Sequence, residues 1–111
     1  AFSHTAPNAD IGRPTFVVAG GGEVRGSLCA ENIVRLGETD ATAMGEKAGW
    51  VMDIMENRLT GLGVGWDQVT ATDVYTVHPL RDIVEGILLP RNSPDAARGM
   101  VPVQYKSCER F

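Results

Sequence analysis

The sequence predicts a single α/β (α+β) domain, with one mixed β-sheet and two helices packed on one of its faces. Three observations indicate this fold: β-branched runs alternate with helical segments, each helical segment has one apolar face, and 111 residues is the size of one domain. Hydrophobic residues make up 43 %, which is enough to build a core. Two helices cover only one face of a sheet, so we expect another copy of the chain to cover the other face.

The first third of the chain predicts short strands joined by turns. Residues 1–13 indicate an irregular arm or a weak edge strand. Residues 15–20 (TFVVAG) are β-branched and aromatic and run into consecutive glycines, which is typical of a strand followed by a turn or bulge. A second short strand is expected within residues 30–36, and the connection between the two strands carries no clear pattern.

A long amphipathic helix is the clearest element, and it begins near Thr39 or Asp40. Either side chain can accept a hydrogen bond from a free N–H group of the first turn. Glycines at positions 61, 63 and 65 end the helix, because glycine adopts the left-handed cap conformation without steric cost. Most of the polar residues, Arg58 among them, fall off the apolar stripe and should face solvent. The stripe comprises Ala41, Met44, Ala48, Val51, Met52, Met55, Leu59 and Leu62.

The second half predicts a strand, a helix and a further strand. Residues 66–77 are rich in threonine, valine and tyrosine, so they indicate a strand, in which Asp73 is either exposed or paired across an interface. Pro79 fits the first turn of a second helix, which Pro90 ends. Residues 91–95 form a loop, and residues 97–105 form a strand that Pro102 places at an edge or a bulge. The second apolar face comprises Leu80, Ile83, Val84, Ile87 and Leu88.

Charge and composition exclude several classes of function. A net charge of −4 and the lack of a basic, aromatic-rich cluster argue against a nucleic-acid or anionic membrane surface. No apolar run is long enough to cross a bilayer, so we expect a cytoplasmic protein. Cys29 and Cys108 indicate reduced thiols, and His4 and His78 lack ligand-like spacing, so we expect no metal.

Three segments resemble the RidA/YjgF family of reactive-intermediate deaminases. Residues 16–21 (FVVAGG) look like the family's "FVSGQ" strand and turn. Residues 37–75 are similar to its helix, its glycine stop and its "D-x-V-x-x-T-x-V-(F/Y)" strand, here DQVTATDVY. Residues 97–101 (ARGMV) look like the "ARSxV" motif that supplies the active-site arginine. Together the segments cover residues 15–105 in the family's order, which makes residues 1–111 a single RidA-like domain.

The resemblance implies both an assembly and a reaction. It implies a chorismate-mutase-like fold and a homotrimer with clefts between the subunits. The reaction would be hydrolysis of a small 2-imino or 2-enamino acid, of the 2-iminobutanoate/2-iminopropanoate type, to a 2-oxo acid and ammonia. No cofactor is implied. The family's arginine, which grips the substrate carboxylate, corresponds to Arg98.

Arg98 and Glu109 are the candidate catalytic residues. A guanidinium offers a planar fork of donors that matches a carboxylate, so Arg98 can bind an organic acid in a cleft. The alternative is a structural ion pair with Asp95, with Glu109 or with a neighbouring subunit. Glu109 corresponds to the family's water-holding carboxylate across a shortened loop, or it is a solvated residue of the charged tail.

Ala19, Gly20, Gly21 and Met100 are the further candidate substrate-binding residues. The two glycines can present backbone N–H groups to a ligand, or they form a plain turn. Ala19, Gly21 and Met100 stand where the family has serine, glutamine and cysteine. This loss of polar groups favours the alternative function, a non-catalytic protein that binds a small carboxylate ligand at subunit interfaces.

Overall fold

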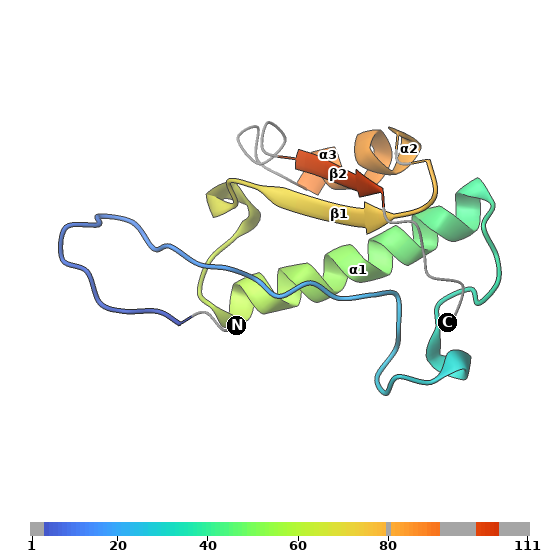
Figure 1. The fold of residues 1–111 in the computed structure, drawn as a ribbon, viewed down its shortest axis with the longest axis horizontal. Helices are drawn as coiled ribbons and strands as arrows, with labels where there is room; N and C mark the ends of the chain where they lie inside the picture. Colours follow the sequence, from blue (N-terminus) through green and yellow to red (C-terminus); the bar gives the residue numbers. More distant parts are fainter. Residues whose placement is uncertain (1–3, 80, 92–99, 105–111) are drawn as a thin grey trace.

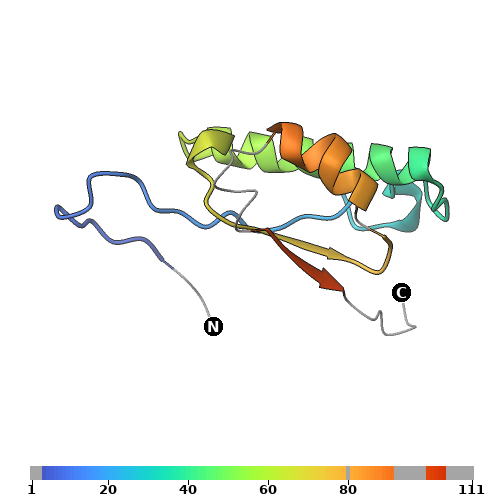
Figure 2. The ribbon, with the colours of Figure 1, turned by 90° about the horizontal axis from the view of Figure 1, so that it is seen from above.

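Two helices and two strands form the centre of the structure (Figure 1). The computed structural model describes residues 4–79, 81–91 and 100–104. Figure 2 shows the helices on one side of the strands, which fits the α+β architecture that the sequence predicts. In chain order the elements are η1 (Ala30–Asn32), α1 (Ala41–Gly61), η2 (Trp66–Gln68), β1 (Thr72–Thr76), α2 (Arg81–Ile83), η3 (Val84–Leu88), α3 (Leu89–Arg91) and β2 (Met100–Gln104).

Helix α1 has the local signals that the sequence predicted. Asp40 is its N-cap, and its side chain accepts hydrogen bonds from the backbone N–H groups of Thr42 (3.0 Å) and Ala43 (3.1 Å). The helix ends at Gly61, and Gly63 follows with a φ of +74°, a conformation that glycine adopts without strain. The predicted start and the glycine stop are therefore confirmed.

Residues 81–91 form one helix of three consecutive parts, α2, η3 and α3. The prediction that Pro90 ends this helix is wrong, because the helix continues to Arg91. Proline lacks the N–H group of a regular turn, and its ring crowds the carbonyl four residues earlier. The π-helical turn η3, where the N–H of Leu89 bonds to the carbonyl of Val84, directly precedes this part of the helix.

The two helices share a hydrophobic core above β1. Met52 of α1 packs with Ile83 and Leu88 of the second helix, and all three are nearly inaccessible to solvent. The partly buried residues packed against this cluster are Met44, Ala48, Trp66, Val74 and Ile87. The predicted stripes thus supply most of this cluster, but Ala41 and Leu62 at the two ends of the first stripe are exposed. Ala43, which the prediction left off the stripe, is fully buried, and Leu80 lies outside the described residues.

Strands β1 and β2 pair in parallel, from Thr72 opposite Met100 to Thr76 opposite Gln104. Within the described residues the sheet is therefore two-stranded and parallel, not mixed. The predicted strand over residues 66–77 begins later than expected, since Trp66–Gln68 form the 3-10 turn η2. Asp73 lies on an exposed position of β1, which is one of the two arrangements expected for it.

The strands predicted at residues 15–20 and 30–36 are wrong. Residues 15–20 are extended, with Phe16 and Val18 half-buried and Val17 83 % exposed, but they join no ladder among the described residues. Residues 30–32 form η1, and Ile33 makes a single antiparallel bridge with Val24. The side chain of Asn32 donates to the carbonyl oxygen of Ser27 (2.9 Å), which helps to close a turn where the sequence suggested a strand.

Candidate active site

The sequence-predicted site residues divide between two parts of the chain. Ala19, Gly20 and Gly21 are described in full. For Met100 the structure gives the backbone, which opens β2 opposite Thr72 of β1. Arg98 and Glu109 lie outside the described residues. The structure therefore shows the surroundings of the glycine turn and the start of the strand that follows the arginine motif.

Arg58 of α1 contacts residues 19–21, which we call the glycine turn after their prediction, although the chain is extended there in the structure. The Nη1 atom of Arg58 donates hydrogen bonds to the backbone carbonyl oxygens of Ala19 and Gly20, the latter at 2.8 Å. These contacts join residues 38 and 39 positions apart in the sequence. The sequence placed Arg58 on the solvent-facing side of α1, and no local pattern predicts a contact of this range.

Gly21 lies directly against α1. A Cβ atom at this position would stand 3.5 Å from Arg58 Nη1 and 3.5 Å from side-chain atoms of Ile54 and Met55. A Cβ at Gly20 would meet no atom within 4 Å. The turn therefore rests on the helix at Gly21 and is open at Gly20, so a ligand has room to approach its backbone.

Most of the positive side chains near α1 are paired with carboxylates. Lys47 lies 3.8 Å from Glu23, and Arg91 lies 2.7 Å from Asp53. Within the described residues no carboxylate forms an ion pair with Arg58. The side chain is exposed and contacts two neutral carbonyl groups, which leaves its positive charge able to attract an anion.

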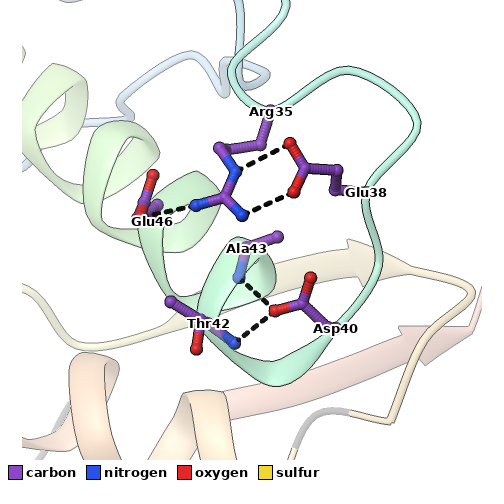
Figure 3. A network of polar contacts seen from close by, with 6 residues as sticks. All are labelled: Arg35, Glu38, Asp40, Thr42, Ala43 and Glu46. Atoms are coloured by element: carbon purple, nitrogen blue, oxygen red, sulfur yellow. Dashed lines mark hydrogen bonds and ion pairs between the residues drawn. The ribbon is translucent and has the colours of Figure 1, made fainter.

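Arg35 provides a contrast at the other end of α1 (Figure 3). Its guanidinium binds both carboxylate oxygens of Glu38, and its Nη1 atom donates to Glu46 at 2.8 Å. The hydrogen bond from Arg35 lowers the pKa of Glu38, and the backbone N–H of Ala43 lowers the pKa of Asp40. With two carboxylates already bound, Arg35 braces the loop against α1 and is not available for a ligand.

A cavity of about 310 Å³ lies between the start of α1 and the second helix. Its polar lining residues are Thr39, His78 and Asp82, and Met44, Ile83 and Ile87 belong to its apolar wall. The backbone N–H of His78 bonds to Thr76 Oγ1 at 3.1 Å. Since Arg58 belongs to the last turn of α1, this cavity is at the opposite end of the helix from the glycine turn.

The described residues lack two kinds of feature. No group of three or more histidine, cysteine, aspartate or glutamate side chains there is placed to hold a metal ion. No helix in that part of the chain combines the length and the apolar character required to cross a bilayer.

Comparison with known proteins identifies the family. The chain matches the family described as 2-aminomuconate deaminase CnbZ over residues 1–106. It is 39 % identical over 87 residues to the 2-amino-5-chloromuconate deaminase of Comamonas testosteroni. These matches define a RidA/YjgF-like class of deaminase proteins, as the three sequence segments indicated. Within that class, the chain belongs to the 2-aminomuconate deaminase CnbZ family.

The match to the curated relative has a limited extent. It covers 76 % of this chain but 35 % of the relative, so the chain spans about a third of that protein's length. No solved structure matches the chain.

Proposed function

We propose that the chain forms part of a hydrolytic deaminase for 2-aminomuconate-type acids. The observation that carries this proposal is the family match over residues 1–106, supported by a relative whose name gives a chlorinated 2-aminomuconate as its substrate. 2-Aminomuconate is a six-carbon diene with a carboxylate at each end and an amino group on C2. It is therefore a 2-enamino acid, the substrate class that the RidA/YjgF resemblance implies.

The reaction balances with water as the only co-substrate. The enamine takes up a proton on carbon and becomes a 2-imino acid, and water adds to C2. The C2–N bond then breaks, ammonia leaves, and a 2-oxo acid remains. In this proposal Arg98 binds the carboxylate next to C2 through its planar fork, and Glu109 orients or deprotonates the water. Ala19, Gly20, Gly21 and Met100 line the substrate.

The proposal includes assembly into a homotrimer with clefts between the subunits. Val74 of β1 packs toward the helices, whereas the neighbouring Tyr75 is 63 % exposed. Val77, just beyond the strand, is 51 % exposed. Asp73 is exposed on the same side of β1 as Tyr75, so burial of this face against another copy of the chain requires a partner for its carboxylate. Light scattering of the purified chain tests this part, and a monomeric mass at working concentration would contradict it.

Ammonia release tests the proposed reaction. The substrates are 2-aminomuconate and 2-iminobutanoate, each generated enzymatically, and the proteins are the native chain and Arg98→Ala. We expect release from 2-aminomuconate above the uncatalysed rate, reduced about 100-fold in Arg98→Ala because the carboxylate contact is lost. Equal rates for the two proteins would remove Arg98 from the site.

A second candidate function is non-catalytic binding of a small carboxylate. Ala19, Gly21 and Met100 favour it, because they replace three polar residues of the RidA/YjgF pattern. It predicts that the native chain binds a small unsaturated acid without releasing ammonia from any imine, and that Arg98→Ala loses the binding.

A further inference from the structure

We propose that Arg58 determines specificity for dicarboxylates by binding the carboxylate of the substrate that is remote from the amino group. This inference rests on the proposed function, because a second carboxylate is what distinguishes 2-aminomuconate from the simple imino acids of the wider family. Arg98 would bind the carboxylate next to the reacting carbon. A separate donor group is then needed for the carboxylate at the far end of the carbon chain, and a cation suits it best.

The position of Arg58 supports this role. It reaches from α1 to the carbonyl oxygens of Ala19 and Gly20, two of the residues that the RidA/YjgF resemblance places against the substrate. Both bonds use Nη1 alone. A guanidinium carries five N–H groups, so those on Nε and Nη2 remain for a carboxylate. The carbonyl contacts would hold the guanidinium in place before a ligand arrives, which lowers the entropy cost of binding.

The charge of Arg58 supports the role as well. Arg35, Lys47, Arg81 and Arg91 each form an ion pair with a glutamate or aspartate. Among the described residues Arg58 forms no such pair, and neither do Arg13 and Arg25, the second of which lies 5.4 Å from the ring centroid of Trp50. Of these three arginines, Arg58 is the one that contacts the backbone of residues 19 and 20. A carboxylate that binds Arg58 therefore has no ion pair to displace.

The sequence of the turn makes room for this arginine. The RidA/YjgF pattern has glutamine where this chain has Gly21. A Cβ there would already be 3.5 Å from Arg58 Nη1, and a longer side chain would compete with the guanidinium for the surface of the turn. In this chain the guanidinium of Arg58, and no side chain at position 21, lies against the turn, and its charge suits a second carboxylate.

Binding of two unreactive acids tests the inference without any turnover. Muconate (hexa-2,4-dienedioate) and sorbate (hexa-2,4-dienoate) share one carbon chain and differ by one carboxylate. By calorimetry we expect the native chain to bind muconate about tenfold more tightly than sorbate. Arg58→Gln should abolish this preference while leaving the affinity for sorbate unchanged. Glutamine retains an N–H donor for the carbonyls of the turn, and melting temperatures check that the variant is folded.

Two further variants separate charge from structure. Arg58→Lys keeps the charge and should retain part of the preference for muconate. Arg81→Gln removes an exposed arginine that pairs with Glu85 on the second helix, and it should leave the preference unchanged. A preference that survives Arg58→Gln overturns the inference. So does an equal loss of affinity for both acids, since Arg58 would then only brace the turn. A native chain that binds neither acid overturns it too.

The two proposals fail in different ways. If the native chain prefers muconate through Arg58 but releases no ammonia from 2-aminomuconate, the binding role stands and the deaminase proposal is wrong. If ammonia is released and the muconate preference does not depend on Arg58, the deaminase proposal stands and the role of Arg58 is wrong.

Discussion

The helical layer and the N-terminal region of this protein are held by different forces. The helical layer, which consists of α1 and residues 81–91, buries Met52, Ile83 and Leu88 in one apolar cluster. In residues 4–38 the buried hydrophobic residue is Val34, while Val17 is 83 % and Leu28 is 93 % exposed. Polar contacts attach this region to α1, where Trp50 Nε1 donates to the carbonyl of Val24 and Arg58 holds the glycine turn.

This difference matters for function because the candidate site spans both regions. Ala19, Gly20 and Gly21 come from the weakly packed region, and Arg58 comes from the helical layer. Exposed hydrogen bonds and ion pairs contribute little to global stability, whereas buried apolar side chains contribute most of it. Local opening of residues 19–21, the candidate ligand-binding segment, should therefore cost less free energy than unfolding of the helices.

The largest expected effect is the loss of a core side chain. Met52→Ala should lower the free energy of unfolding by about 2–5 kcal/mol, since Met52 is 4 % exposed and joins both helices. Val17→Ala, at an 83 % exposed position, should change it by less than about 0.5 kcal/mol. Chemical denaturation monitored by circular dichroism measures both. If Val17→Ala lowers the free energy of unfolding strongly, another copy of the chain covers the N-terminal region. The difference in packing between the two regions would then hold only for the isolated subunit.

A smaller effect is expected at the start of α1, where Asp40 combines a cap with a charge. The hydrogen bond from the N–H of Ala43 lowers the pKa of Asp40 in the folded protein. Its contribution to stability is therefore complete above the ordinary aspartate pKa of about 4, and it is lost as the pH falls through the lower folded value. The melting temperature of the native chain should accordingly fall as the pH drops below about 4.

Two variants of Asp40 separate the cap from the charge. Asp40→Ala should lower the melting temperature by a few degrees at neutral pH, because the N–H groups of the first turn lose their acceptor. Asp40→Asn keeps an acceptor and should stay near the native value, but with a weaker acid dependence. The Glu38–Arg35 pair is unchanged in both variants, so its own acid dependence cancels in the comparison. An unaltered acid profile in Asp40→Asn would assign the pH dependence to other carboxylates.

The same division between the two regions explains which elements the sequence could predict. Helix α1 depends on signals within a few residues, namely the cap at Asp40, an apolar stripe of period three to four and a glycine at position 63. Residues 15–20 have the composition and the in-and-out alternation of a strand, but a strand also needs a partner backbone, and local sequence does not specify one. Composition alone therefore over-predicted strands in the region with the least burial.

The candidate site was predicted in part for the same reason. Motif order proposed Ala19, Gly20 and Gly21 as site residues, and their role stays a prediction. The contacts of Arg58 with Ala19 and Gly20 were not predicted, because they join positions 39 and 38 residues apart and because an arginine on the polar side of α1 resembles any solvated arginine. Pro90 led to the opposite error, since it predicted the end of a helix that continues to Arg91. The π turn that precedes it has no signature in the sequence.

The smallest expected effect concerns Arg35, which braces the N-terminal region against α1. Its φ of +50° is unfavourable for a residue with a side chain, and its pairs with Glu38 and Glu46 hold it there. Arg35→Gln should keep the melting temperature within about a degree or two of that of the native chain, because exposed ion pairs add little to global stability. Hydrogen exchange should nevertheless become a few-fold faster at the amides of Val34 and Glu38, which bond to the carbonyls of Glu23 and Arg35.

Arg81→Gln is the matched control, since it removes an exposed pair with Glu85 from the second helix and should not alter exchange at either amide. If Arg35→Gln instead lowers the melting temperature as much as Asp40→Ala does, the loop and α1 unfold as one cooperative unit. The N-terminal region would then be coupled to the helical layer through its charges, and the glycine turn would be as rigid as the helix against which it rests.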